Sequence, residues 1–174
     1  MKKIVLALSV LVFIGCGGGG GSSDGDEIVN LTNTKPETIN SELETKIANE
    51  LKNASSYQKI FVKKHPYGGY IKTTQGFRVK IGEEIVSCDG INYAGAYIMN
   101  NKINLISIDN DNDTLEGYIP KVGNKYVLNI DDGETTGKVE LNLSDDKKYL
   151  TGYISLYEKE VKKYCKREIY LKKQ

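Results

Sequence analysis

The pattern of apolar and polar residues changes along the chain. Over residues 34–54 apolar residues recur every four positions, and over much of the chain beyond residue 57 they alternate with polar residues. A four-residue recurrence places side chains on one face of a helix, whereas alternation indicates a strand with one buried and one solvated face. We therefore expect one amphipathic helix and, from Tyr57 onward, a β-rich domain.

The helical segment carries its own start signal. Thr34 and Glu37 have the spacing of a capping box, and Pro36 falls in the first turn. The apolar stripe along this helix is narrow and consists of Ile39, Leu43, Ile47 and Leu51. We expect the stripe to dock the helix on the domain, and a contact with a partner or a second copy is the alternative.

Alternation is clearest over residues 77–81, 138–143 and 149–157. Turn signals rich in Asn, Asp and Gly separate such segments by roughly 8 to 14 residues, which suits antiparallel hairpins. We expect a mainly β fold, an up-and-down meander of about eight strands that closes, or nearly closes, into a small barrel. A twisted open sheet covered by the helix is the alternative. The turn signals lie at residues 100–102, 109–113, 123–125, 131–133 and 145–148.

The N-terminal stretch MKKIVLALSVLVFIGC fits neither pattern. Two lysines precede an uncharged run over residues 4–14, which is shorter than the roughly 20 residues that a membrane-spanning helix needs. This run and the sequence Phe13-Ile14-Gly15-Cys16 resemble the signal peptide and lipobox of bacterial lipoproteins, with Phe13 where leucine is usual. The resemblance implies that residues 1–15 are removed at export and that the Cys16 thiol carries a lipid. A secreted protein with a chance cysteine is the alternative.

Five glycines come directly after Cys16. A glycine-rich chain is a flexible coil, so residues 16–33 are expected to be a lipidated tether and residues 34–174 the folded domain. By the same resemblance, glycine rather than aspartate after Cys16 is compatible with the outer membrane, on its periplasmic or its surface face. The expected partners are thus the membrane, through the lipid, and an envelope or surface protein.

Charge argues against a nucleic-acid partner. Without Lys2 and Lys3 the chain has 22 basic and 23 acidic residues, so it has no overall basic field. The remaining cysteines are Cys88 and Cys165. Since an exported chain meets an oxidising compartment, we predict that they form a disulfide, with two buried free thiols as the alternative.

Asp109, Asp111 and Asp113 have the alternate spacing that begins a calcium-binding loop. The EF-hand pattern then requires glycine at the sixth position and glutamate at the twelfth, where this chain has Thr114 and Pro120. We predict a polar hairpin loop and no metal site, with these aspartates as the alternative metal ligands. In a meander this loop would lie beside residues 131–134 and form an acidic rim suited to a weakly bound divalent cation or a basic partner.

Tyrosines and lysines mark two further faces. Tyr149, Tyr153 and Tyr157 lie opposite the aliphatic positions of their segment, so we expect them outside the barrel, with an aromatic interior as the alternative. The basic C-terminal segment places Cys165, Ile169 and Leu171 on one face. We interpret it as a solvated edge strand guarded by lysines, with phospholipid headgroups or an acidic glycan as alternative ligands.

Catalytic motifs are sparse. The only histidine is His65, in KKHPYGGY, and no zinc-protease, serine-hydrolase or phosphate-loop motif occurs. We therefore expect a non-enzymatic interaction module without a cofactor. The alternative is a small-ligand binder with a pocket inside the barrel, for which Gly95, Gly117 and Gly152 are the places where space could remain.

Overall fold

The computed structural model describes residues 36–109 and 114–174, and the side chains of residues 36–39 and of Glu84 are not described. The expected signal peptide, the lipid-bearing Cys16 and the glycine-rich tether therefore lie outside the described residues, as do Asp111 and Asp113.

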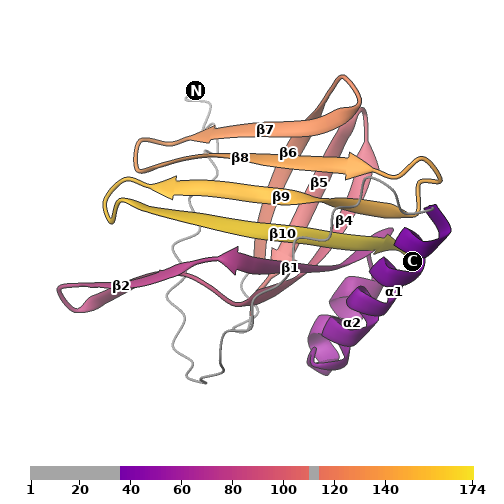
Figure 1. Ribbon diagram of the computed structural model, residues 1–174, viewed down its shortest axis with the longest axis horizontal. Helices are drawn as coiled ribbons and strands as arrows, with labels where there is room; N and C mark the ends of the chain where they lie inside the picture. The colour runs from indigo at the N-terminus through magenta and orange to yellow at the C-terminus, as the bar shows by residue number, and fades with distance from the viewer. Residues whose placement is uncertain (1–35, 110–113) are drawn as a thin grey trace, which may run out of the picture.

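The core of the fold is a closed antiparallel barrel with the strand order β1-β10-β9-β8-β7-β6-β5-β4 (Figure 1). This confirms the expected mainly β fold. In Figure 1, β4, β5 and β6 cross behind β7, β8, β9 and β10 at a steep angle, so the barrel is flattened into two crossed layers. The barrel strands are β1 (Tyr67–Gln75), β4 (Ile91–Met99), β5 (Lys102–Ile108), β6 (Thr114–Val122), β7 (Lys125–Asp131), β8 (Thr135–Leu143), β9 (Tyr149–Glu158) and β10 (Lys163–Lys173).

The tight turns arise at residues that tolerate positive φ. Asn100 and Asn101, at φ 51° and 59°, join β4 to β5, and Gly123, at φ 61°, lies in the turn between β6 and β7. Two-residue hairpins of this kind match the right-handed twist of the strands they join, and asparagine and glycine adopt them at low cost. The turn signals in the sequence thus set the strand boundaries here.

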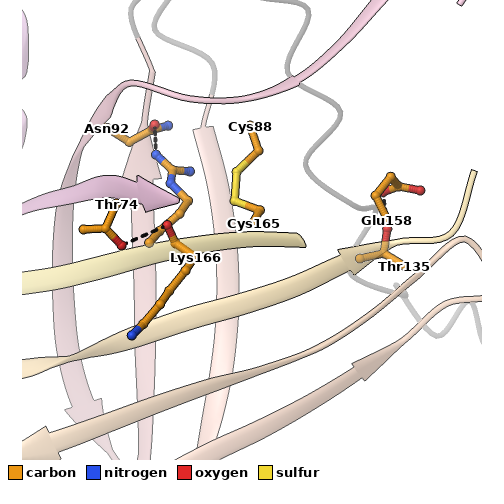
Figure 2. The surroundings of a disulfide bond; sticks show 8 residues. Thr74, Cys88, Asn92, Thr135, Glu158, Cys165 and Lys166 are labelled. Atoms are coloured by element: carbon orange, nitrogen blue, oxygen red, sulfur yellow. Dashed lines mark hydrogen bonds between the residues drawn. A yellow bond between two sulfur atoms is a disulfide. The ribbon is translucent and has the colours of Figure 1, made fainter. Parts of the chain in front are cut away.

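One hairpin lies outside the barrel. Strands β2 (Phe77–Ile81) and β3 (Glu84–Cys88) pair only with each other and form a separate two-stranded sheet. The hairpin projects from the end of β1 (Figure 1). Cys88 at its end and Cys165 in β10 lie within disulfide-bonding distance, with Cα atoms 6.2 Å apart, as the sequence predicted. Figure 2 shows this bond joining the hairpin to the barrel wall.

Within the described residues two helices precede the barrel, α1 (Pro36–Lys52) and α2 (Ser56–Lys63). The prediction that the β pattern begins at Tyr57 was wrong, since β1 begins ten residues later at Tyr67. A capping box starts α2: the Ser55 hydroxyl accepts from the Gln58 amide at 3.2 Å, and the Gln58 side chain accepts from the Ser55 amide at 2.8 Å. These two bonds satisfy the backbone N–H groups of Ser55 and Gln58 at the start of the helix. In a strand the same groups would need acceptors on a neighbouring strand.

The helices pack on the outer wall of the barrel. Ile47 is 3% exposed, and Leu43 and Leu51 are partly buried beside it, so the stripe docks α1 on the domain as expected. Glycine allows α2 to approach closely, because a Cβ on Gly68 would lie 2.5 Å from the Val62 carbonyl oxygen. The barrel residues beneath the helices are Tyr70, Tyr93, Ile108 and Tyr149.

Candidate binding surface

The barrel interior is lined by one continuous apolar cluster. Leu150, Ile154 and Leu156 of β9 belong to it, so the aliphatic side of that strand faces inward and its tyrosines face outward, as predicted. Tyr67 also faces inward, and its hydroxyl donates to the Lys147 carbonyl at 3.0 Å. The other members come from the remaining seven barrel strands and from the disulfide: Ile71, Cys88, Ala94, Ala96, Ile103, Leu105, Ile119, Tyr126, Val139, Leu141, Cys165, Ile169 and Leu171.

Two of the three glycines expected to leave space inside the barrel do not do so. Gly95 belongs to the outer wall, where a Cβ would lie 2.3 Å from the His65 ring. At Gly152 a Cβ would lie 1.9 Å from the carbonyl oxygen of Glu140 on the neighbouring strand. The lack of a side chain therefore lets the His65 ring pack against Gly95 and lets the Glu140 backbone approach Gly152. Gly117, the third, is half-buried on β6.

The end of the interior near the disulfide is polar. Arg167 is 2% exposed, and its guanidinium donates to the Asn92 side chain at 2.5 Å (Figure 2). Burial lowers the pKa of Arg167 to about 10. The negative charge of Asp89, between β3 and β4, acts in the opposite direction and partly offsets this effect. The Asn92 Nδ2 and the Thr73 Oγ1 are buried without a hydrogen-bond partner. The sequence could have indicated Arg167, because it shares the alternation of Cys165 and Ile169.

The C-terminal segment is a central strand. β10 pairs along its length with β9 on one side and with β1 on the other, so the interpretation as an edge strand was wrong. Because the barrel closes between the first and last strands of the chain, an edge that the sequence placed at the C-terminus does not exist. The lysines of this segment, such as Lys166, remain exposed on the outer wall.

The predicted tyrosine face is outside the barrel but is not uniformly accessible. α1 covers Tyr149, which is 2% exposed and donates to Glu44 at 3.0 Å. Tyr153 donates to Glu140 at 3.3 Å, and Tyr157 packs against Tyr164 with ring centroids 4.6 Å apart. The hydroxyls of Tyr149 and Tyr153 and the ring of Tyr157 are thus engaged by other residues of the domain. The tyrosine face is therefore a weaker binding surface than the sequence suggested.

Only part of the predicted acidic rim lies among the described residues. Asp131, Asp132 and Glu134 lie at the end of β7 and in the turn after it, where Asp131 is paired with Lys159 at 3.2 Å and Asp132 accepts from the turn amides. Across residues 36–109 and 114–174, no three His, Cys, Asp or Glu side chains are placed to share a metal ion. Of the aspartates named as alternative metal ligands, only Asp109 is among these residues.

A different group of side chains gathers on the outer face of β4, β5 and β6. Tyr97, Asn104 and Tyr118 form one row across the three strands, since Asn104 pairs with both tyrosines. The Asn104 amide nitrogen donates to the Tyr97 hydroxyl at 2.6 Å and to the Glu116 carboxylate, and Tyr118 donates to Glu116 at 3.0 Å. Asn104 is consequently 2% exposed although it faces out of the barrel.

Large exposed side chains lie in this row and beside it. Met99, Tyr118 and Val122 are 56%, 53% and 60% exposed. Hydrogen bonding to Glu116, and then to Tyr97, raises the pKa of Tyr118 to about 12, so its hydroxyl keeps its proton to a higher pH than that of an ordinary tyrosine. We call Tyr97, Met99, Asn104, Glu116, Tyr118 and Val122 the outer patch. Sequence reasoning missed it because these residues come from three strands and the row exists only once the register is known.

The barrel wall opens beside the outer patch. β6 pairs with β5 from Thr114 to Pro120, but with β7 it forms only the pairs Lys121–Tyr126 and Val122–Lys125 within the described residues. The ladder ends where Pro120 would face Val127. The Lys121 amide donates to Asn101 on the β5 side, so the backbone of Pro120 faces β7, and proline has no N–H to donate. We call the space between β6 and β7 beyond these pairs the seam.

The two edges of the seam differ. The Asp132 amide donates to the β8 side, so by alternation Val127 and Asn129 direct their backbone groups into the seam. Leu128 and Ile130 of β7 face the interior and are only partly buried. Unlike the edge of β6, the edge of β7 contains no proline, and it lies next to the partly buried apolar side chains of Leu128 and Ile130. Pro120 within an alternating segment was a usable sequence signal, because proline in a sheet is confined to edges and bulges.

Among the described helices none is long and apolar enough to cross a bilayer. No protein-family model, no curated protein and no solved structure matches this chain. The candidate binding regions of this chain are therefore the outer patch, the seam and the barrel interior.

Proposed function

We propose that this chain is a lipid-anchored lipoprotein of the bacterial cell envelope whose barrel is a non-enzymatic interaction module for an envelope or surface protein. The lipobox resemblance at Cys16 supports the anchor, and the flexible glycine-rich segment after it would let the barrel extend away from the membrane. Glycine rather than aspartate directly after Cys16 supports the outer membrane as the location. The observation that carries the binding role is the outer patch, where Met99, Tyr118 and Val122 remain largely exposed around a hydrogen-bonded polar centre.

The composition of the outer patch suits protein recognition. Tyrosine and methionine are enriched at protein interfaces because they bury much area at low conformational cost, and clustered exposed apolar side chains mark interaction sites. The hydrogen bonds from Asn104 and Tyr118 to Glu116 fix the patch before binding, which reduces the entropy lost on association. The continuous apolar interior favours this outer surface over a pocket inside the barrel.

Photo-crosslinking in intact cells tests the binding role. A photoreactive phenylalanine analogue at Tyr118 or Met99 should form a defined adduct, whereas the same analogue at the exposed Asn142 on β8 should not. Equal adducts at all three positions, or none at the patch, would contradict the proposal.

The anchor has a separate test. Cys16→Ala should move the protein from the membrane fraction to the soluble fraction and abolish labelling by a radioactive fatty acid. A variant that stays in the membrane fraction, or a wild type that takes up no label, would remove the lipid from the proposal while leaving the binding role open.

A second candidate, a small-ligand binder, rests on the polar end of the interior. Arg167, Asn92 and Thr73 place donors there, two of which have no partner, and the apolar cluster lies beyond them. Native mass spectrometry of residues 27–174, secreted through the periplasm, tests it with and without calcium. A co-purifying small molecule would favour this candidate and a bare mass the outer patch, while a calcium adduct would revive the acidic rim.

A further inference from the structure

We propose that the seam between β6 and β7 receives an extended segment of the partner protein, which adds as a strand to the edge of β7. The inference rests on the proposed function, because the segment would be part of the partner that contacts the outer patch. Four observations carry it: the short ladder, the placement of Pro120, the exposure of apolar side chains at the seam, and the distribution of charge along it.

The first two observations select the edge. Pro120 cannot donate a hydrogen bond into the seam, and proline on a sheet edge discourages pairing. On β7 no proline occurs, and Val127 and Asn129 each present an N–H and a C=O to the seam. An incoming strand could therefore form up to four main-chain hydrogen bonds with β7 over a length of about three residues.

Side chains give the added strand a preferred pattern. Leu128 and Ile130 of β7 and Leu115 of β6 face the interior and are incompletely covered. Alternate residues of a strand that pairs with β7 would point to the same side and cover them. The segment should therefore be apolar at alternate positions and polar in between.

Charge sets the orientation. The open end of the seam is the end away from the paired residues. There β6 carries Glu116, and the end of β7 and the turn after it carry further carboxylates. These are Asp131, Asp132 and Glu134, and all four side chains are exposed. Lys159 pairs with Asp131, and the carboxylates outnumber this lysine, so the open end is negative overall. At the closed end lie Lys121 and Lys125. A lysine or arginine on the segment should therefore lie at the open end, because opposite charges steer and align a partner.

A matched pair of variants at Asn129 tests the backbone contact. Asn129→Pro removes the N–H that faces the seam, whereas Asn129→Ala changes the same exposed side chain and keeps the N–H. The probe is the blocked hexapeptide Lys-Val-Thr-Val-Thr-Val, and a second peptide replaces its lysine with glutamate. Binding is followed through the backbone amide NMR signals of the whole folded domain.

We expect the lysine peptide to shift the amide signals of Val127 and Asn129 and to bind Asn129→Pro about tenfold more weakly than Asn129→Ala. The glutamate peptide should bind more weakly to the wild type. Glu134→Lys should narrow or invert this preference, a readout that does not depend on whether the proline variant folds. Equal affinity of both Asn129 variants at unchanged melting temperature would overturn the inference.

If neither peptide bound the wild type, the inference would also be overturned. The crosslinking experiment at Tyr118 separates this failure from failure of the proposed function. An adduct that persists in Asn129→Pro cells would keep the outer patch as the binding surface and exclude the seam. Loss of the adduct in Asn129→Pro, with retention in Asn129→Ala, would support both.

Discussion

Glu140 illustrates how single residues hold the barrel wall together. Its carboxylate accepts from Lys125 at 2.5 Å and from Lys138 at 2.7 Å, and Tyr153 donates to it at 3.3 Å. These partners come from β7, β8 and β9, so one side chain links three strands on the outside of the barrel. The hydrogen bonds from Lys125, and then from Lys138, lower the pKa of Glu140 to about 2.

Glu140 should therefore make stability depend on pH. Its folded pKa lies below the ordinary value of 4.5, so its ionised form stabilises the fold above that pH, and this contribution is lost as the pH falls from about 4.5 toward 2. Urea unfolding should show Glu140→Gln to be less stable than the wild type at neutral pH, with a difference that shrinks over that range. A difference that stays constant with pH would show that the charge is not responsible.

Gly152 should tolerate no side chain. A Cβ at this position would lie 1.9 Å from the Glu140 carbonyl oxygen, and this atom belongs to the backbone and cannot move aside. Gly152→Ala is expected to reduce the unfolding free energy by roughly 1–3 kcal/mol, the usual cost of overpacking. Asn142→Ala, on the exposed outer face of β8, is the control and should change stability little. Similar unfolding midpoints for the two variants would contradict the close approach of the strands.

At the scale of elements, α2 is the clearest departure from the sequence prediction. Its eight residues are too few for a recurring apolar stripe, and only Gln58 and Val62 are buried. The start signal was nevertheless present, because Ser55 and Gln58 have the capping-box spacing that we recognised at Thr34 and Glu37. A short helix is marginal by itself, so its packing against β1 and β4 is what makes the signal effective.

The capping box gives a prediction at this scale. Ser55→Ala should destabilise the domain by about 1 kcal/mol, because the Gln58 amide loses its acceptor. Ser56→Ala changes the next residue, which is exposed and lies outside the box, and should be close to neutral. Denaturant unfolding of the two variants compares them directly, and equal effects would argue against a capping role.

At the scale of the whole molecule, the Cys88–Cys165 disulfide spans a long stretch of chain. The sequence separation of 77 residues predicts that the bond stabilises the fold by about 4 kcal/mol, if it acts through the entropy of the unfolded chain. A reducing agent should lower the unfolding free energy of the wild type by that amount and leave the double variant Cys88→Ser, Cys165→Ser unchanged. No response of the wild type would mean that the bond contributes little.

The barrel closure also shows why some faces were predicted and others were not. The alternation over residues 138–143 and 149–157 predicted which side chains face inward, since the period of two is a property of the strand itself. Whether an outward-facing residue is accessible depends on what packs over it. Tyr149 is therefore buried by α1, whereas Tyr118 on the opposite layer remains exposed.

The sequence by itself determined the elements whose cause is local. It specified the docked helix α1, turns between barrel strands and the inward face of the segments over residues 138–143 and 149–157, because periodicity and turn residues act over short stretches of chain. The cysteine pair was predicted from composition, since Cys88 and Cys165 are the two cysteines other than Cys16. The anchor at Cys16 and the envelope location remain predictions from the sequence.

Only the tertiary structure decided what depends on strands far apart in the chain. Register brought Tyr97, Asn104 and Tyr118 into one row, closure made β10 a central strand, and crossing of the two layers beside Pro120 opened the seam. These features arise from pairing and packing between distant segments, which no local pattern encodes. The surfaces proposed for binding belong to this second group.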